Sequence, residues 1–388
     1  MRAPARASCM DETRRDMTVS ASPSVAVPGN ALPAICDISV TNVCNAACDF
    51  CGFARDKKLV GPRRYLDREA FARALPILRR RHIKYVTFQG GEPLLHPDIV
   101  ELVASASQAG MVCSLISNGW FLTRHIEGLA RAGLKRLLVS IDSHSMLEHE
   151  LNRGLNGLER RISEGVAAAR AHGIPTCATV TVSRLVRYEA LPETLARLGF
   201  DAVAFSYPRR EPFGSTSLVY DETSTLVDLD KDEIVDALHA IARMKRHFRV
   251  VDPAGALAEV ERFVRGEEQL VPCIGGRKYF YIDWNLDIWR CEAWSAPMGS
   301  VFDLDRMPDE TEPCNACIMS CYRHGSVLMH GAIAAADAYE AVKHGHVGAA
   351  VSALRQRGVM YSLWSLSTEA LPRQVLRRKP RTIARATK

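Results

Sequence analysis

Hydrophobic and polar residues follow two different periods along the first half of the chain, and these periods predict its elements. Short apolar runs rich in β-branched residues are typical of buried strands, and they lie at 35–41, 85–89, 112–117, 136–142, 176–182 and 202–207. Amphipathic stretches of helical period lie between them, at 67–80, 97–109, 123–132, 158–172 and 190–198. Strands separated by helix-length segments indicate βα units with a parallel sheet. The pattern therefore predicts an α/β fold, a partial (β/α)6 TIM-like barrel that spans residues 34–207 and is open at one side.

After the sixth strand the hydrophobic pattern changes, and the rest of the chain divides into three parts. Residues 208–270 read as a connector, with a helix near 231–247 and a short strand at 248–251. Residues 271–325 contain a hairpin around a polar turn and five cysteines, which predicts a small C-terminal cysteine-rich cap built from a β-hairpin and helix. Residues 326–388 are a helical extension with a basic tail, and residues 1–33 are expected to form a disordered leader.

Composition and charge restrict the class of protein. A hydrophobic fraction of 47% and a charged fraction of 24% are ordinary for a soluble globular chain. No apolar stretch is long enough to span a bilayer and no secretory signal is visible, so we expect a cytoplasmic location. The net charge of +6 comes from the tail, because residues 371–388 hold seven basic residues and no acidic one. A nearly neutral body argues against nucleic-acid binding, and the sequence does not predict the oligomeric state.

Three cysteines directly follow the first strand, in the spacing Cys44-x3-Cys48-x2-Cys51. Clustered cysteines in a reducing compartment favour metal binding over disulfides. Thiolates are the preferred ligands of iron–sulfur clusters, and three of them would leave one iron of a cube open for chemistry. A zinc site or a group of free thiols is the alternative, although zinc normally takes four ligands and the loop contains no histidine.

A second motif, Gly90-Gly91-Glu92-Pro93, follows the second strand. A carboxylate after a glycine pair can accept hydrogen bonds from a ligand ammonium group while the backbone approaches closely. A plain Gly-Gly turn is the alternative.

Together with Phe50 before the third cysteine, these motifs resemble the radical S-adenosylmethionine superfamily. Three further segments are also similar to segments of that superfamily: Ser117-Asn118-Gly119, Ser140-Ile141-Asp142 and Asn152-Arg153-Gly154. The resemblance covers roughly residues 35–207. It implies an enzyme in which a 4Fe–4S cluster on Cys44, Cys48 and Cys51 passes one electron to S-adenosylmethionine. The resulting 5′-deoxyadenosyl radical would abstract hydrogen from a substrate, while the protein supplies orientation and excludes water.

The resemblance also implies which residues bind S-adenosylmethionine, with Gly90, Gly91 and Glu92 near its amino group. The other members of the implied cofactor-binding set are Phe50, Pro93, Ser117, Asn118, Ser140, Asp142 and Arg153. Ser117, Ser140 and Asp142 would contact ribose or carboxylate, or else cap strand ends. Arg153 would hold the carboxylate, or else pair with Glu148 or Glu150. A reductant such as flavodoxin or ferredoxin is the expected partner, and no side chain is assigned to the hydrogen transfer itself.

The second group of cysteines has the spacing Cys273-x17-Cys291, then Cys314-x2-Cys317-x3-Cys321. A C-x2-C pair is also common in structural zinc knuckles. The hairpin and the following Gly299 segment resemble the SPASM or shorter twitch extensions of the superfamily, which bind auxiliary 4Fe–4S clusters. Five cysteines fit one such cluster, with the first four as preferred ligands and Cys321 as a spare or the true fourth. That cluster would accept an electron from the substrate radical, bind substrate or be structural, and the sequence does not choose.

The substrate is the least defined part of the prediction. Tyr207, Arg209 and Arg210 follow the sixth strand and would bind an anionic substrate, or form a solvated basic loop. An amphipathic segment at 360–371 before the basic tail suits the surface of an anionic membrane, or else a docking helix. We therefore expect a small-molecule or lipid substrate and possible peripheral membrane contact. The alternatives are maturation of a peptide or protein, for which the segment before the first strand is short, and, remotely, a non-enzymatic iron–sulfur or zinc module.

Overall fold

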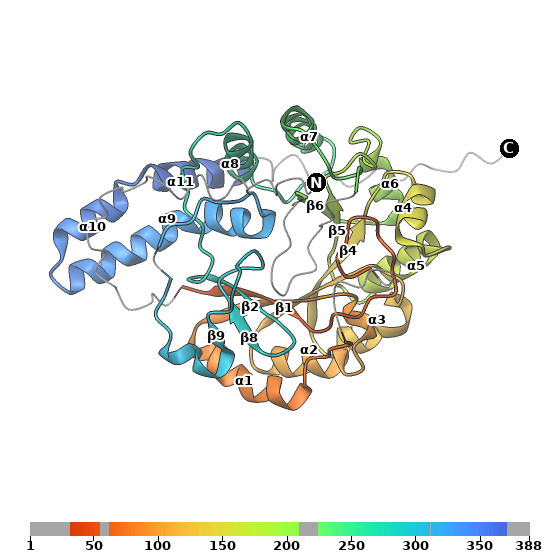
Figure 1. Cartoon of the computed structure of the whole chain (residues 1–388), viewed down its shortest axis with the longest axis horizontal. Coiled ribbons are helices and arrows are strands. Elements are labelled where there is room, and N and C mark those ends of the chain that lie inside the picture. Colours follow the sequence, from red (N-terminus) through yellow and green to blue (C-terminus); the bar gives the residue numbers. More distant parts are fainter. Residues whose placement is uncertain (1–31, 55–61, 209–223, 311, 371–388) are drawn as a thin grey trace, which may run out of the picture.

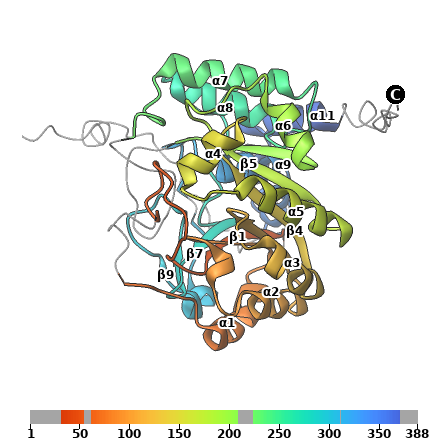
Figure 2. The same cartoon turned by 90° about the vertical axis from the view of Figure 1, so that its right-hand side faces the viewer.

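The computed structural model describes residues 32–54, 62–208, 224–310 and 312–370, and Figures 1 and 2 show it in two orientations. Most of the expected leader, the pair Arg209 and Arg210, and the basic tail after residue 370 lie outside the described residues.

The described strands form one sheet in the order β6-β5-β4-β3-β2-β1-β7-β8-β9. Strands β1 to β7 pair in parallel, whereas β8 and β9 are antiparallel. Their bounds are β1 Ala34–Ser39, β2 Ile83–Gln89, β3 Val112–Ser117, β4 Leu134–Ile141, β5 Thr176–Thr181, β6 Ala202–Ser206, β7 Tyr279–Ile282, β8 Asp287–Trp289 and β9 Gly299–Ser300. The six strands predicted for the barrel are confirmed, with ends that differ by at most two residues.

Helices follow the strands in turn and cover the outer face of the sheet, as Figure 1 shows for α1 to α6. The bounds are α1 Arg68–Arg80, α2 Ile99–Gln108, α3 Leu122–Arg131, α4 Met146–Arg153, α5 Leu158–Ala171, α6 Leu191–Leu198, α7 Lys231–Met244, α8 Ala254–Val264, α9 Ser320–Lys343, α10 Val347–Leu354 and α11 Arg357–Ala370, with short 3-10 helices η2 Pro93–Leu95 and η3 Val301–Arg306. The sequence pattern did not predict α4 or α8. The α/β class and the partial TIM-like barrel are confirmed.

Local sequence sets several of these helix ends. Asp67 caps α1 by accepting the N–H of Ala70 at 2.7 Å, and Asp230 and Glu233 form a capping box at the start of α7. Helix α4 ends at Gly154, whose φ of 60° lies in the left-handed region.

The two faces of the barrel strands differ in burial. Residues such as Phe88, Leu115 and Val139 are fully buried against the helices, whereas their neighbours on the inner face are half-buried. The inner face also carries polar groups, including Ser140, which pairs in register with Thr179 on β5. Because side chains alternate across a strand, the interior of the barrel is lined by polar side chains that solvent still reaches.

The cysteine-rich hairpin is part of the barrel sheet. Strand β7 lies next to β1, with Cys36 opposite Phe280, and the Tyr279 hydroxyl donates to Asp37 Oδ2 at 2.9 Å. The Tyr281 hydroxyl donates to Ser39 Oγ at 2.8 Å. The hairpin expected as a separate cap therefore extends the sheet, because β1 has a free edge on the side away from β2.

Helix α9 joins the sheet to the C-terminal helices and begins before the boundary expected at residue 326. Near its start, Tyr322 stacks on Tyr279 with ring centroids 4.2 Å apart. Arg323 pairs with Glu259 of α8 at 3.8 Å, and both side chains are buried. Helices α10 and α11 pack on α9, and α10 projects from the barrel in Figure 1. Within the described residues, no helix has the length and apolar character needed to cross a bilayer.

Candidate metal and cofactor site

The first three cysteines lie in a loop at the carboxyl end of β1, where barrels of this type place their active sites. Cys48 is buried, Cys44 and Cys51 are half-buried, and the N–H of Ala46 points at Cys44 Sγ at 3.4 Å. Burial, with smaller effects from charged neighbours that include Cys51, raises the pKa of Cys44 to about 12, and burial raises that of Cys48 to about 12 as well. Thiols whose pKa is raised this far, as for Cys44 and Cys48, need a nearby positive charge to ionise, and iron ions would supply it.

The donor set fits a cluster better than a single ion. All three donors are sulfur, and a cube attaches each thiolate to a different iron atom. In the part of the chain that the structure describes, no three His, Cys, Asp or Glu side chains converge closely enough to hold one metal ion. A cube does not require such convergence.

Hydrogen bonds join the cysteine loop to the ends of neighbouring strands and helices. The N–H of Ala47 donates to the Arg153 carbonyl at 2.8 Å, and the N–H of Asp49 donates to Asn152 Oδ1 at 3.3 Å. From the β3 side, Asn118 Nδ2 donates to Asn45 Oδ1 at 2.9 Å. Hydrogen bonds from α4 and from the end of β3 therefore fix the loop along its length. Phe50, also in the loop, is buried.

Close contact with the backbone of a neighbouring segment explains why glycine is needed at both positions of the second motif. A Cβ on Gly90, where φ is +136°, would lie 2.3 Å from the Thr41 carbonyl oxygen, and a Cβ on Gly91 would lie 2.3 Å from that of Val43. The N–H of Gly91 donates to Thr41 O at 2.8 Å. The structure shows close approach to the segment that leads into Cys44, which leaves no room for a side chain. The predicted approach of this backbone to a ligand stays a prediction.

The Glu92 carboxylate is fully buried and already has partners within the protein. Its Oε1 accepts from Leu94 N at 3.0 Å and from Ser117 Oγ at 2.9 Å, and its Oε2 accepts from Asn118 N at 2.7 Å. Burial raises the pKa of Glu92 to about 7, while these hydrogen bonds act against the rise. Glu92 therefore ties the end of β2 to the end of β3, and its predicted contact with a ligand amino group stays a prediction. Pro93, the first residue of η2, is buried behind it.

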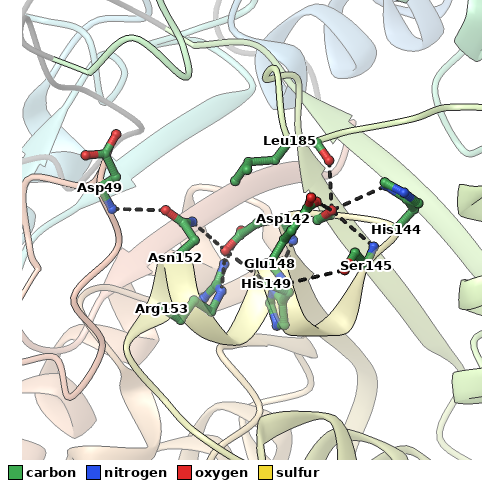
Figure 3. Close-up of polar contacts among 10 residues, drawn as sticks. Asp49, Asp142, His144, Ser145, Glu148, His149, Asn152, Arg153 and Leu185 are labelled. Carbon is green, nitrogen blue, oxygen red and sulfur yellow. Dashed lines mark hydrogen bonds and ion pairs between the residues drawn. The ribbon is translucent and has the colours of Figure 1, made fainter.

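Asp142 and Arg153 form a buried, two-pronged ion pair, shown in Figure 3. Arg153 Nη2 donates to Asp142 Oδ1 at 2.6 Å and its Nε donates to Oδ2 at 2.8 Å. Asn152 Nδ2 donates to the same Oδ2 at 2.9 Å, and His149 Nδ1 accepts the N–H of Asp142 at 3.1 Å. Burial alone would raise the pKa of Asp142, but Arg153 and His149 hold it well below its usual range. The expected alternative, a surface pair of Arg153 with an acidic residue of its own helix, is wrong.

That alternative fails because the acidic residues of α4 bind elsewhere. Glu148 accepts from Ser143 Oγ at 2.7 Å, and Glu150 accepts the N–H groups of Gly157 and Glu159. Arg153 instead points inward, and its positive charge lies close to Cys44 and Cys48. It is placed to balance the negative charge of a thiolate-bound cluster, or to meet a carboxylate there. Ser140, the remaining predicted contact, is half-buried on the inner face of β4.

In the second group of cysteines, Cys291 has three other cysteines as neighbours. Burial raises the pKa of Cys291 to about 12, and nearby Cys317, Cys273 and Cys314 add to the rise. The Cys273 N–H also donates to the Cys314 carbonyl at 2.9 Å. These four cysteines therefore lie near one another.

Cys321 packs against the same small hydrophobic cluster as Cys273, Cys291 and Cys317. Its thiol pKa is raised well above the usual range by burial, then by Glu292 and Asp37 rather than by other cysteines. Glu292, next to Cys291, accepts a short hydrogen bond from Gln89 on β2. A polar cluster of Asp37, Gln89, Tyr279, Glu292 and Cys321 therefore lies next to Cys291. No local pattern predicts this cluster, because its members come from distant segments.

The chain is similar in sequence to several known proteins. Residues 38–198 match the sequence profile described as the Radical SAM superfamily. A GTP 3′,8-cyclase from Stenotrophomonas maltophilia is 33% identical over 145 residues, which is 36% of this chain and 42% of that protein. A probable GTP 3′,8-cyclase from Saccharolobus solfataricus is 29% identical over 229 residues, 58% of this chain and 72% of that protein. This chain thus matches less than half the length of the first relative.

Solved structures share the fold at low sequence identity. SuiB from Streptococcus suis has a TM-score of 0.55 at 15% identity, covering 72% of this chain and 67% of that one. The protein anSMEcpe, in a structure with bound AdoMet, has a TM-score of 0.52 at 14% identity, covering 71% of this chain and 79% of that one. At these identities the likeness establishes the fold.

The burial of Glu92 predicts a pH dependence of stability. Its pKa is raised from 4.5 to about 7, so between these values the folded protein holds a proton that the unfolded chain has lost. The stability that Glu92 contributes is therefore fully present below pH 4.5 and declines as the pH rises to 7, by about 3 kcal/mol. Urea denaturation of the wild type and Glu92→Gln across this range should show the difference in free energy of unfolding shrink accordingly. Glu101→Gln, at an exposed position, is the control. If the difference in free energy of unfolding between wild type and Glu92→Gln stayed constant across this pH range, the raised pKa of Glu92 would be contradicted.

Proposed function

Because this chain belongs to the radical S-adenosylmethionine superfamily, we propose that it cleaves S-adenosylmethionine reductively at a 4Fe–4S cluster on Cys44, Cys48 and Cys51 and removes hydrogen from a small-molecule substrate. The observation that carries the proposal is the cysteine loop itself. One buried and two half-buried thiols lie in the loop at the carboxyl end of β1, and hydrogen bonds at Asn45, Ala47 and Asp49 hold this loop.

When bound, the cluster and S-adenosylmethionine would supply one-electron chemistry and a radical able to break a C–H bond. The chain's own groups hold the geometry for it. The Gly90–Glu92 turn lies against the backbone that enters the cysteine loop, and the Arg153 guanidinium provides a fixed positive charge beside the thiols. The hydroxyl and amide of Ser117 and Asn118 are engaged with Glu92 and Asn45. Their contribution is therefore to the position of the loops, with ligand contact left to groups such as Ser140.

Cys273, Cys291, Cys314 and Cys317 are best explained as the ligands of a second, auxiliary 4Fe–4S cluster. Four thiols supply a full set of ligands, so such a cluster would have no open iron for substrate. That favours a role in electron transfer or structure. Cys321 is not a ligand in this assignment, because the charges that raise the pKa of its thiol are those of Glu292 and Asp37.

A small-molecule substrate suits the inner face of the barrel, where half-buried polar side chains such as Ser140, Thr179 and Ser206 line the sheet. Curated relatives named GTP 3′,8-cyclase act, by name, on a nucleotide, so GTP is a natural first candidate to test. Maturation of a peptide is the second candidate, favoured by the fold shared with SuiB, which has been solved with its precursor peptide SuiA. Mass spectrometry of products from each candidate, made with S-adenosylmethionine and a reductant, separates the two.

We further propose peripheral contact with an anionic membrane through α11. Met360, Leu363, Trp364 and Leu366 are all more than 40% exposed, and the first three share one helical face. The chain continues from α11 into the basic segment 371–388, a combination that suits anionic lipid. A lipid substrate would then reach the enzyme from the bilayer.

Removing one ligand of the first site tests the central proposal. Anaerobic reconstitution should load about eight iron atoms on the wild type and about four on Cys44→Ala. With dithionite and S-adenosylmethionine, the wild type should form 5′-deoxyadenosine and the variant should not. Cys113→Ala, which alters a buried cysteine of β3, is the control and should behave as wild type. A wild type that neither binds nor cleaves S-adenosylmethionine would overturn the proposal.

The ligand set of the auxiliary site is tested by two serine substitutions. Cys317→Ser should lose about four iron atoms per chain, whereas Cys321→Ser should keep all of them, because Cys317 is among the cysteines whose charge acts on Cys291 and Cys321 is not. Iron and sulfide analysis with low-temperature electron paramagnetic resonance measures both. Loss of iron from Cys321→Ser but not from Cys317→Ser would reverse the assignment, and one zinc ion in place of four irons would make the site structural.

The membrane contact predicts binding to lipid vesicles. The wild type should co-sediment with vesicles that contain phosphatidylglycerol and much less with pure phosphatidylcholine. The variant Leu363→Gln/Trp364→Gln should lose several-fold of this binding, since two apolar anchors are removed. Exposed Leu147→Gln on α4 is the matched control. Equal binding of wild type and the double variant would show that α11 is not the contact.

A further inference from the structure

A run of basic residues ends α1 and leads into β2. Residues 79–84 read Arg-Arg-Arg-His-Ile-Lys, so five of these six residues are basic. Two of the five are neutralised by carboxylates of the C-terminal segment. Arg80 Nε donates to Asp305 Oδ2 at 2.8 Å, and Arg81 Nη2 donates to Asp309 Oδ1 at 2.6 Å. These two ion pairs do not account for the other three basic residues of the run.

The other three, Arg79, His82 and Lys84, line one surface cavity of about 350 Å³. Among the described residues, no acidic side chain lines this cavity, and its remaining lining residues are apolar or glycine: Pro33, Ile83, Ala109, Gly110 and Met111. A volume of this size is at the lower end of the range for small-molecule sites, roughly 300–1,000 Å³. The cavity therefore combines an apolar wall with three basic groups, a composition that suits an anionic small molecule.

The backbone at His82 is in a conformation that usually favours glycine. Its φ is 59°, in the left-handed region, and among the described residues Leu286 is the other non-glycine residue there. His82 directly follows the C-cap of α1, and its N–H donates to the Arg79 carbonyl at 3.0 Å. Helices commonly place glycine at this position, because a Cβ is unfavourable there. A side chain kept at a strained position that faces a cavity points to a use for that side chain.

Hydrogen bonding fixes a second basic group at the cavity. Lys84 Nζ donates to the Gly110 carbonyl at 2.6 Å, across from the end of α1 to the turn after α2. An ammonium group has three N–H donors, so two remain for a ligand. Arg79 belongs to the last turn of α1 and brings a guanidinium whose planar donors match the oxygens of a phosphate. Each of the three is exposed and would be an ordinary surface group alone, but together they surround one cavity.

The cavity lies at the amino ends of the strands whose carboxyl ends carry the candidate site. Pro33 directly precedes β1, Ile83 begins β2 and Met111 directly precedes β3. The same strands lead into the cysteine loop, the turn at 90–92 and the segment 117–118. Strands of six or seven residues separate the two ends by roughly 20 Å. A ligand in the cavity would therefore not occupy the space of S-adenosylmethionine.

We propose that this cavity binds a small phosphorylated molecule, with Arg79, His82 and Lys84 as donors to its phosphate group and the apolar wall in contact with the rest of the ligand. The site is separate from the one proposed for S-adenosylmethionine. Binding there requires neither an iron–sulfur cluster nor a reductant, so this inference stands or falls independently of the proposed function.

The test is isothermal titration calorimetry of the anaerobic holoenzyme with phenyl phosphate, in a low-salt buffer free of phosphate. The wild type should bind phenyl phosphate and should not bind phenol, and the binding should weaken as salt is added. Arg79→Gln should bind about tenfold more weakly, because one charged hydrogen bond to the phosphate is lost. Arg73→Gln, an exposed position of α1 outside the cavity, is the matched control and should bind as the wild type does.

The variant His82→Asn separates binding from folding. Asparagine also tolerates the left-handed conformation, so the urea midpoint of unfolding should stay at the wild-type value. Its affinity for phenyl phosphate should nevertheless fall several-fold, because the imidazole is lost. A purely structural role for His82 would not produce this difference.

The proposal would be overturned by a wild type that binds phenyl phosphate no better than phenol, or by equal affinities of the wild type and Arg79→Gln. If the variants do not fold, hydrogen exchange on the wild-type holoenzyme decides. Phenyl phosphate should then slow exchange within 79–84 and 109–111, and slowing confined to any other segment would reject this cavity as the site.

Discussion

The cysteine loop has almost no regular structure of its own, and the site depends on the hydrogen bonds that hold it from outside. Asn118 reaches Asn45, and the α4 end reaches Ala47 and Asp49. Each of these anchors is itself fixed by a buried charge. Glu92 holds Asn118 by its backbone N–H, and Asp142 holds Arg153 and Asn152. Burying a carboxylate is costly unless its oxygens are well paired, so these arrangements resist change once formed.

This constraint changes how the motifs should be understood. The Gly-Gly-Glu turn and the serine and asparagine after β3 look from sequence like ligand contacts, and here much of their hydrogen bonding is to each other. Ser117 and Asn118 both donate to Glu92, and Gly91 donates to Thr41. A residue that positions a loop is as sensitive to substitution as one that touches the cofactor. Motif membership alone therefore cannot assign either role.

The sequence predicted the strands and most barrel helices because their signal is local: a period of hydrophobicity and a turn or cap at each end. It also placed the three cysteines after β1. It missed α4, a short helix that exposes Leu147 and Leu151 and buries His149 and Arg153, so these residues depart from the usual amphipathic pattern. The partner of Arg153 and the acidic neighbours of Cys321 depend on segments far apart in the chain. No local signal marks them.

The position of β7 bears on how the two cysteine sites could work together. Because β7 pairs in parallel with β1, the loop after β1 and the hairpin that ends at Cys291 are mounted on adjacent strands of one sheet. Hydrogen bonds from Tyr279 to Asp37 and from Gln89 to Glu292 cross between them. A separate cap on a flexible connector would let that distance vary, whereas a shared sheet fixes it. Electron transfer between two clusters would be strongly sensitive to their separation, so a shared sheet would suit two clusters that exchange electrons.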